Sequence, residues 1–184
     1  MFHFYKRRDN LTMAIGLKRG TVRLAAFSRS WKGEFEKEKR RLARRLGGVL
    51  IDIQHIGSTS IPGIMAKPII DIGVAVKSVA NLNRFKKLVK PLGYEFIAEA
   101  SNLKNHLVFT KGAGQFRTHH LHIEKHNSRV WKNDLSFRDY LISHKAAARQ
   151  YEKLKIALSK KHPKDRRGYT KSKTGFVKNI LKRR

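Results

Sequence analysis

The residues best suited to chemistry lie in a run that begins at His55 and ends at Asp71. Gly57 follows a β-branched segment, and a glycine there lets the backbone approach a ligand closely because it has no Cβ. The adjacent Ser58 and Thr59 offer hydroxyls and backbone N–H groups, which can hold phosphate oxygens. Asp71 lies on the next apolar segment, where a carboxylate can hold a divalent cation that bridges triphosphate oxygens. The run therefore predicts a site for phosphates and a metal.

An ordinary tight turn followed by a solvated aspartate is the competing explanation of this run. The segment around Asp71 reads IIDIGVAV and is almost wholly apolar, as is typical of a strand that is buried on both faces. No polar–apolar alternation explains an acid at that position. We therefore expect the carboxylate to have a function.

A second group of reactive side chains occupies the segment HHLHIE, residues 119–124. Successive side chains of a strand alternate between faces, so His120, His122 and Glu124 are expected on one face. Two imidazoles and a carboxylate can ligate a metal, act as acid or base, or contact phosphate. A solvated, histidine-rich sheet face is the alternative. The set is incomplete for a zinc site, so zinc is not the expected ion.

Basic side chains near these segments could neutralise a phosphate or pyrophosphate. The candidates are Lys67, Lys111 and Arg117, although chance placement is a serious competitor among 42 lysines and arginines. Lys67 stands out because it is the only basic residue of the range 49–76.

The net charge of +29 favours anionic partners such as nucleic acid, nucleotides or an anionic membrane surface. Residues 32–45 hold seven basic and three acidic residues, and residues 160–184 hold eleven basic and one acidic. Both segments are expected to be helical surfaces, which makes RNA a possible partner. A general bias toward basic surfaces explains the charge equally well.

The composition also excludes several classes of site and location. The chain has no cysteine, which excludes disulfides, thiolate metal sites and a cysteine nucleophile. No run reaches the roughly 18 apolar residues of a membrane-spanning helix. The basic N-terminal segment has no continuous apolar core or clear cleavage site, so a secretory signal is not expected. Walker A and G-x-G-x-x-G loops are absent from the sequence. We expect a cytoplasmic protein, with an organellar presequence as the minority alternative for the basic N-terminus.

Hydrophobic periodicity predicts alternating helices and strands. Strands are expected over 49–56, 69–76, 94–98, 106–110 and 119–124, with a short β-like piece in 21–31; helices are expected over 32–46, 78–92, 128–142, 144–161 and 170–182. This order predicts an α+β fold with a mixed sheet flanked by helices and a C-terminal helical segment. Residues 1–20 are expected to be a loose basic extension of a domain that spans 21–184.

Several motifs together closely resemble the GrpB family, over nearly the whole chain from Val22 onward. They are HIGSTSIPGIMAKPIID, GYEFIAEA, RTHHLHIE, FRDYLISH and HPKDRRGYTKSKTGFV. The resemblance implies a nucleotidyltransferase-like fold, in which a Gly-Ser pair positions a triphosphate. It also implies a D-x-D pair that, with a third acid, holds two magnesium ions. Gly57 and Ser58 match the first motif, and Asp71 matches the first acid of the pair.

The sequence departs from the superfamily pattern at the second acid, because that position is Gly73. The missing carboxylate must then come from elsewhere. Glu124, beside His120 and His122, and Glu99, in the motif GYEFIAEA, are the two candidates for completing the metal site. The segment after Glu99 also departs from the family, which suggests a different acceptor.

Three functions remain open from the sequence. The leading hypothesis is a nucleotidyltransferase-like protein that binds a nucleoside triphosphate with Mg²⁺ and transfers a nucleotidyl group to an unknown acceptor. The first alternative is a non-catalytic binding module associated with nucleotides or the CoA pathway. The second is a basic protein associated with RNA. None of the three implies a membrane partner, and the oligomeric state is open.

Overall fold

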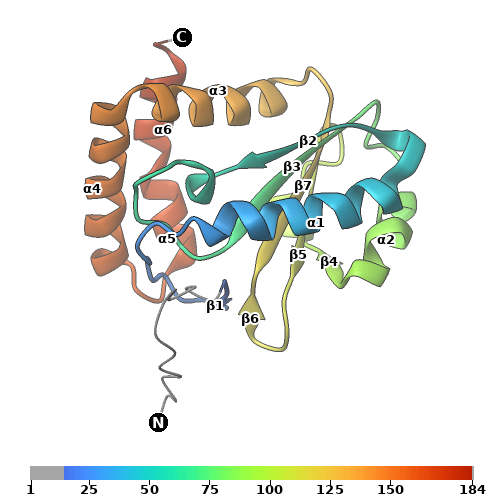
Figure 1. Cartoon of the computed structure of the whole chain (residues 1–184), viewed down its shortest axis with the longest axis horizontal. Helices are drawn as coiled ribbons and strands as arrows, with labels where there is room; N and C mark the ends of the chain where they lie inside the picture. The colour runs from blue at the N-terminus through green and yellow to red at the C-terminus, as the bar shows by residue number, and fades with distance from the viewer. Residues whose placement is uncertain (1–14, 184) are drawn as a thin grey trace.

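The computed structural model describes residues 15–183 and places a five-stranded mixed sheet at its centre (Figure 1). The strand order is β2-β3-β7-β5-β4. In that order the strands are Leu50–Ile56, Ile70–Val76, His119–Lys125, His106–Lys111 and Tyr94–Phe96. β3 and β7 run parallel, and the other neighbouring pairs run antiparallel. The predicted α+β class with a mixed sheet is therefore confirmed.

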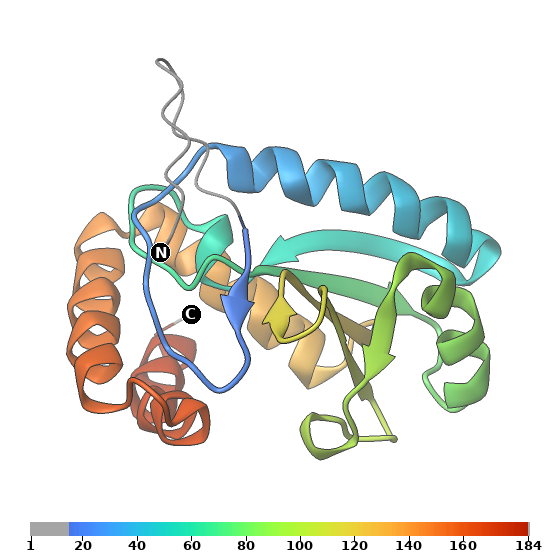
Figure 2. The same ribbon diagram turned by 90° about the horizontal axis from the view of Figure 1, so that it is seen from below.

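One face of the sheet is covered by α1 (Ser30–Leu46) and α2 (Leu82–Val89), as Figure 2 shows. The apolar side of α1, with Trp31 and Leu42 fully buried, packs in one core with alternate residues of β3 and β7. The charged residues of α1 face outward, because a helix with one apolar stripe buries only that stripe.

The other face is crossed by α3 (Arg129–Ser143). Beside one end of the sheet stand α4 (Lys145–Lys161), α5 (Arg166–Ser172) and α6 (Thr174–Leu181), the predicted C-terminal helical segment (Figure 1). A second, smaller core joins these helices to the loop after β2. Its buried members are Ile61, Ile64, Leu141, Ala147, Ala148, Tyr151 and Ile180. None of the helices among residues 15–183 has the length and apolar composition that crossing a membrane requires.

The first described residues pack against the domain. β1 (Leu17–Lys18) pairs antiparallel with β6 (Phe116–Arg117), and the backbone of Gly16 donates a hydrogen bond to Pro68. The β-like piece expected in 21–31 is reduced to a single bridge between Ala25 and Ala66. Most of the expected N-terminal extension, residues 1–14, lies outside the described residues.

Two helix boundaries differ from the predictions, and capping residues explain both. α2 begins at Leu82 rather than near residue 78, because the Asn81 side chain caps it by accepting from the Arg84 N–H. The helix expected over 170–182 is two helices that meet at Lys173. Asp165 caps the first of them by accepting from the Gly168 N–H.

Candidate functional site

The Gly57 turn lies directly against the Asp71 carboxylate. β2 ends at Ile56, which pairs with Asp71 of β3, and Gly57 then adopts a φ of 68°. A Cβ on Gly57 would collide with the carboxyl group of Asp71. Both the backbone conformation and the lack of space therefore require glycine at this position. The backbone of the turn and the carboxylate thus form one continuous surface.

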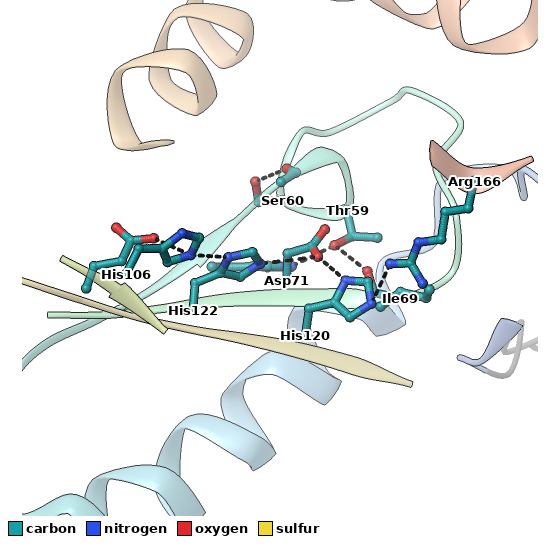
Figure 3. Close-up of polar contacts among 11 residues, drawn as sticks. Thr59, Ser60, Ile69, Asp71, His106, His120, His122 and Arg166 are labelled. Carbon is teal, nitrogen blue, oxygen red and sulfur yellow. Dashed lines mark hydrogen bonds and ion pairs between the residues drawn. The ribbon is translucent and has the colours of Figure 1, made fainter. Parts of the chain in front are cut away.

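The two hydroxyl residues after Gly57 point in different directions. Ser58 lines the pocket that contains Asp71. Thr59 is buried, and its hydroxyl lies 3.0 Å from Nε2 of His55 and donates to the carbonyl of Ile69 at 3.3 Å (Figure 3). The Thr59 side chain therefore holds the loop in shape, and its predicted contact with nucleotide would have to come from its backbone.

The parallel pairing of β3 and β7 brings Asp71 to His120 and His122. The register sets Asp71 beside His120 and Gly73 beside His122. Oδ1 of Asp71 lies 2.8 Å from Nδ1 of His120 and 4.0 Å from Nε2 of His122 (Figure 3). Burial raises the pKa of Asp71, but the hydrogen bonds and charges of the two histidines outweigh it and hold that pKa well below its usual range. Asp71 is therefore a carboxylate, with its side chain 27% exposed to the pocket.

Arg166 of α5 completes this polar row on its other side. Its guanidinium donates to Nε2 of His120 at 2.8 Å (Figure 3). A guanidinium has no acceptor, so Nε2 must be unprotonated, and Nδ1 of His120 then carries the proton that is shared with Asp71. Burial lowers the pKa of His120, in keeping with a neutral ring.

The row continues along the sheet face to His106, which lines the neighbouring pocket, and to the buried Glu124. Nδ1 of His122 lies 3.0 Å from Nε2 of His106 on β5, and that nitrogen lies 3.7 Å from Oε1 of Glu124. Glu124 is fully buried beside Asp134 of α3. Burial and the neighbouring Asp134 carboxyl raise the pKa of Glu124 to about 8, so that this acid is protonated at neutral pH.

A pocket of about 370 Å³ opens above Asp71. Its polar lining joins the turn to three cations: Gly57, Ser58, Asp71, His120, His122, Asp134, Lys67, Arg166 and Lys173. Three aromatic residues, Phe137, Tyr151 and Tyr169, complete its wall. A neighbouring pocket of about 670 Å³ shares His120, His122 and Arg166 with it, and contains Glu99 and Arg117. The site thus holds the carboxylate of Asp71 and the carboxyl group of Asp134 among imidazoles and positive charge.

Lys67 carries the clearest electrostatic signature of an anion site. Its ammonium lies 5.1 Å from the centre of the Tyr169 ring. Burial, together with the positive charges of Arg166 and Lys173, lowers the pKa of Lys67 to about 7. The negative charge of bound phosphate oxygens would offset the mutual repulsion of these three cations.

Gly73, the position where the sequence resemblance implied a second acid, lies under α3. A Cβ at Gly73 would lie 3.2 Å from the Trp131 ring of α3 and 3.3 Å from the side chain of Ile56. α3 therefore packs onto the position where the second carboxylate would stand. The packing of this helix on the sheet therefore leaves little room for a side chain at Gly73.

Three other residues named from the sequence, Glu124, Glu99 and Lys111, do not line the pocket above Asp71. Glu124 belongs to a group with His106 and His122 and does not line the pocket, and Glu99 lies outside both ligand groups in the described chain. Neither acid is brought to Asp71, and their roles as metal ligands stay predictions. Lys111 lies on the opposite face of the sheet, where its ammonium is 2.7 Å from Oε1 of Glu38.

Four residues of the site were missed by reasoning from the sequence: His106, Asp134, Arg166 and Lys173. The last two lie in the motif HPKDRRGYTKSKTGFV, so their membership of a shared motif was a usable signal. Asp134 and His106 gave no such signal, because only the packing of α3 and the register of β5 bring them to the site.

Comparisons with known proteins place the chain among relatives of one kind. A profile of the family described as GrpB protein matches residues 21–183. The glutamate-rich protein GrpB of Alkalihalophilus pseudofirmus is 38% identical over 170 residues, which cover 91% of this chain and 98% of that protein. The UPF0157 protein YqkA of Bacillus subtilis is 34% identical over 178 residues, 97% of this chain. The chain spans only 48% of the length of that second relative.

Solved structures give a matching result. The crystal structure of conserved protein GrpB from Enterococcus faecalis superimposes with a TM-score of 0.79 at 33% identity, covering 88% of this chain and 96% of that one. The MgGTP-bound Cid1 poly(U) polymerase aligns with a TM-score of 0.47 at 16% identity, a likeness too weak to transfer chemistry. From the profile, the relatives and the crystal structure together, the chain belongs to the GrpB family.

Proposed function

We propose that this protein binds a nucleoside triphosphate in the pocket above Asp71 and transfers its nucleotidyl group to an acceptor. One observation carries the proposal. A single pocket joins a glycine turn, a partly exposed carboxylate and three cations, Lys67, Arg166 and Lys173. These are the groups that a polyphosphate and its metal require.

The polyphosphate would lie between the Gly57 turn and the three cations. Backbone N–H groups of the turn and the hydroxyl of Ser58 can hold its oxygens. Lys67, Arg166 and Lys173 offer charge where it develops on the departing pyrophosphate as the acceptor attacks the α-phosphate. The aromatic wall, which includes Tyr151 and Phe137, offers apolar surface on which a base can rest.

The residues at Asp71 fit a divalent cation. The carboxylate is ionised and partly exposed, and imidazole nitrogens of His120 and His122 lie close to it. Mg²⁺ is the ion that the superfamily implies, and a Mg²⁺ ion carried in by a triphosphate needs only one or two protein carboxylates. When bound, a divalent cation would neutralise charge on the phosphoryl oxygens.

Calorimetry of nucleotide binding tests the proposal. We expect ATP, GTP, CTP or UTP to bind in the presence of Mg²⁺ or Mn²⁺, and Asp71→Asn to weaken that binding by at least about tenfold, roughly 1.4 kcal/mol. Glu34→Gln removes a carboxylate from α1, on the opposite face of the sheet from the pocket, and should leave the affinity unchanged. Binding that is equal in Asp71→Asn and the wild type would sink the proposal.

Release of pyrophosphate separates the catalytic proposal from the binding-module alternative. The measurement runs each triphosphate against a panel of acceptors that includes CoA precursors, tRNA and water. Turnover that is lost in Asp71→Asn supports transfer. Tight nucleotide binding without turnover supports a binding module. The glycine at position 73, where a second acid was expected, also favours that alternative.

RNA is proposed as an acceptor only through α5 and the lysine that follows it. Arg166 and Lys173 line the pocket, and Arg167 and Lys171 line its neighbour, so basic side chains of this segment extend from one pocket to the other. On α1, Lys37 pairs with Glu34 and Arg41 with Glu38, which partly neutralises its basic side. RNA binding through the α5 segment would weaken steeply with salt.

A further inference from the structure

Three side chains at the floor of the pocket present donor atoms to one point. Asp71 comes from β3, and His120 and His122 come from the neighbouring parallel strand β7. Their donor atoms all lie within 4.8 Å of one another. The two-residue alternation of β7 places both imidazoles on the face that carries Asp71. The backbone itself therefore holds the three groups together.

The spacing is close to that of a metal's ligands. Bonds of about 2.0–2.2 Å set neighbouring ligand atoms about 3.0–3.5 Å apart around a tetrahedral or octahedral ion. The two distances from Oδ1 of Asp71, 2.8 Å to His120 and 4.0 Å to His122, fall on either side of that range. Small side-chain rotations suffice to bring all three atoms to bonding distance.

We propose that Asp71, His120 and His122 bind one first-row transition-metal ion of the Zn²⁺, Mn²⁺, Fe²⁺ or Co²⁺ class in preference to Mg²⁺. Imidazole nitrogen suits these ions, whereas Mg²⁺ selects oxygen ligands in near-octahedral geometry. Two imidazoles and one carboxylate leave coordination positions open toward the pocket, as in sites where the metal also meets a substrate. The inference identifies the metal of the proposed site, and any catalytic role of that metal rests on the proposed function.

The surroundings of His122 support a ligand role. A metal-binding histidine normally donates its second N–H to a neighbouring acceptor, which fixes the tautomer and the ring orientation. With Nε2 toward Asp71, Nδ1 of His122 faces Nε2 of His106 at 3.0 Å. The two rings are stacked with an interplanar angle of 10°, so the orientation of His122 is already set.

Arg166 couples metal binding to the position of the proton on His120. In the structure Arg166 donates to Nε2 of His120, which leaves the proton on Nδ1. A metal on Nδ1 moves that proton to Nε2, so that two donors would oppose each other. Metal binding therefore releases Arg166 from His120, and both Arg166 and the metal then face the pocket in which the polyphosphate would lie.

The neighbouring group formed by His106, His122 and Glu124 is a weaker candidate. Glu124 is fully buried beside Asp134, and neither Glu124 nor His106 lines the pocket above Asp71. The two groups share His122 but differ in Asp71 and His106. Substitution of these two residues therefore distinguishes the sites.

The test is a titration of the full-length, chelator-treated protein with Co²⁺ and Zn²⁺ in the absence of nucleotide. We expect about one equivalent of each ion to bind at micromolar concentration or below, and a hundredfold excess of Mg²⁺ not to displace it. The visible absorption of bound Co²⁺ reports the coordination without any substitution. No stoichiometric binding by the wild type, or displacement of the ion by Mg²⁺, would overturn the inference.

Variants then locate the ion. Asp71→Asn and His122→Gln should each weaken Co²⁺ binding by at least about tenfold. His106→Gln should change it less, and His162→Gln, in the partly buried segment between α4 and α5, should not change it. Binding that depends on His106 or His162 but not on Asp71 contradicts the assignment. Circular dichroism of each variant checks that the fold is retained.

Arg166→Gln separates this inference from the proposed function. The amide removes a positive charge and offers a carbonyl to the Nε2 proton of His120, so Zn²⁺ should bind several-fold more tightly. The same change should weaken triphosphate binding. Intact metal binding without nucleotide binding would refute only the proposed function, and nucleotide binding without a transition-metal site would refute only this inference.

Discussion

At the scale of single residues, Gly57 and Asp71 define the site through one close contact. Asp71 occupies the space that a side chain on Gly57 would need. The backbone of Gly57 also has a conformation that only glycine adopts without strain. The carboxylate is thus held between the turn on one side and His120 on the other. A change at Gly57 must act on stability and on the site together.

Gly57→Ala tests this contact. The added methyl group would meet the Asp71 carboxylate and force strained backbone, which should cost about 2–4 kcal/mol of unfolding free energy in urea denaturation. Gly20 also has a positive φ, but nothing lies near its missing Cβ, so Gly20→Ala carries the backbone strain alone, about 1 kcal/mol. Equal losses in the two variants would show that Gly57 has no packing role.

At the scale of elements, α3 decides which acids the sheet can present. Its Trp131 packs on Gly73, and its Asp134 reaches both the pocket and the buried Glu124. The helix therefore closes the position of the second acid and supplies a different carboxylate next to it. Contact between α3 and β3 therefore leaves Asp71 as the carboxylate that β3 offers to the proposed metal site, beside the two imidazoles of β7.

Gly73→Asp should not restore a second metal ligand. The new side chain would meet Trp131 and Ile56, and overpacking together with a buried charge should destabilise the fold by about 3 kcal/mol. In the double variant with Trp131→Ala, the space opens, so the combined loss should be at least about 1 kcal/mol smaller than the sum of the single losses. Additive losses in a denaturation cycle would rule out the steric explanation.

At the scale of the whole molecule, several partly or fully buried histidines should make stability depend on pH. Burial lowers the pKa of His55, His106 and His119 to about 4 in each case. His55, near the end of β2, is stacked on Phe35 and lies 3.0 Å from the hydroxyl of Thr59. Burial lowers its pKa more than the charges of Asp71 and Arg138 shift it. Each ring folds uncharged, whereas the unfolded chain takes up a proton near pH 6.5.

The expected consequence is a loss of stability in acid. Between pH 6.5 and 4 the unfolded state binds more protons than the folded state, so the unfolding free energy falls as the pH falls through this window. His55 alone contributes up to about 3 kcal/mol to that fall. His55→Gln should therefore flatten the curve of unfolding free energy against pH, measured by urea denaturation from pH 4 to 7. Parallel curves for the variant and the wild type would contradict this assignment.

The order of helices and strands could be predicted from the sequence because it depends on local patterns. Apolar periodicity marked the buried strand around Asp71, and two-residue alternation placed His120 and His122 on one face. Helix limits were less accurate where a capping side chain such as Asn81 set them. The family could be recognised because its motifs are specific and recur in one order.

The sequence by itself determined the Gly57 turn, the carboxylate of Asp71 and the shared face of the two histidines. Only the tertiary structure decided which side chains meet them. The parallel register of β3 and β7 brings Asp71 to His120, and α5 brings Arg166 from far along the chain. Strand register and helix docking depend on long-range packing that no local pattern encodes. For that reason the sequence could name Asp71, the two histidines and Lys67, but not Arg166, Lys173 or Asp134, which line the same pocket.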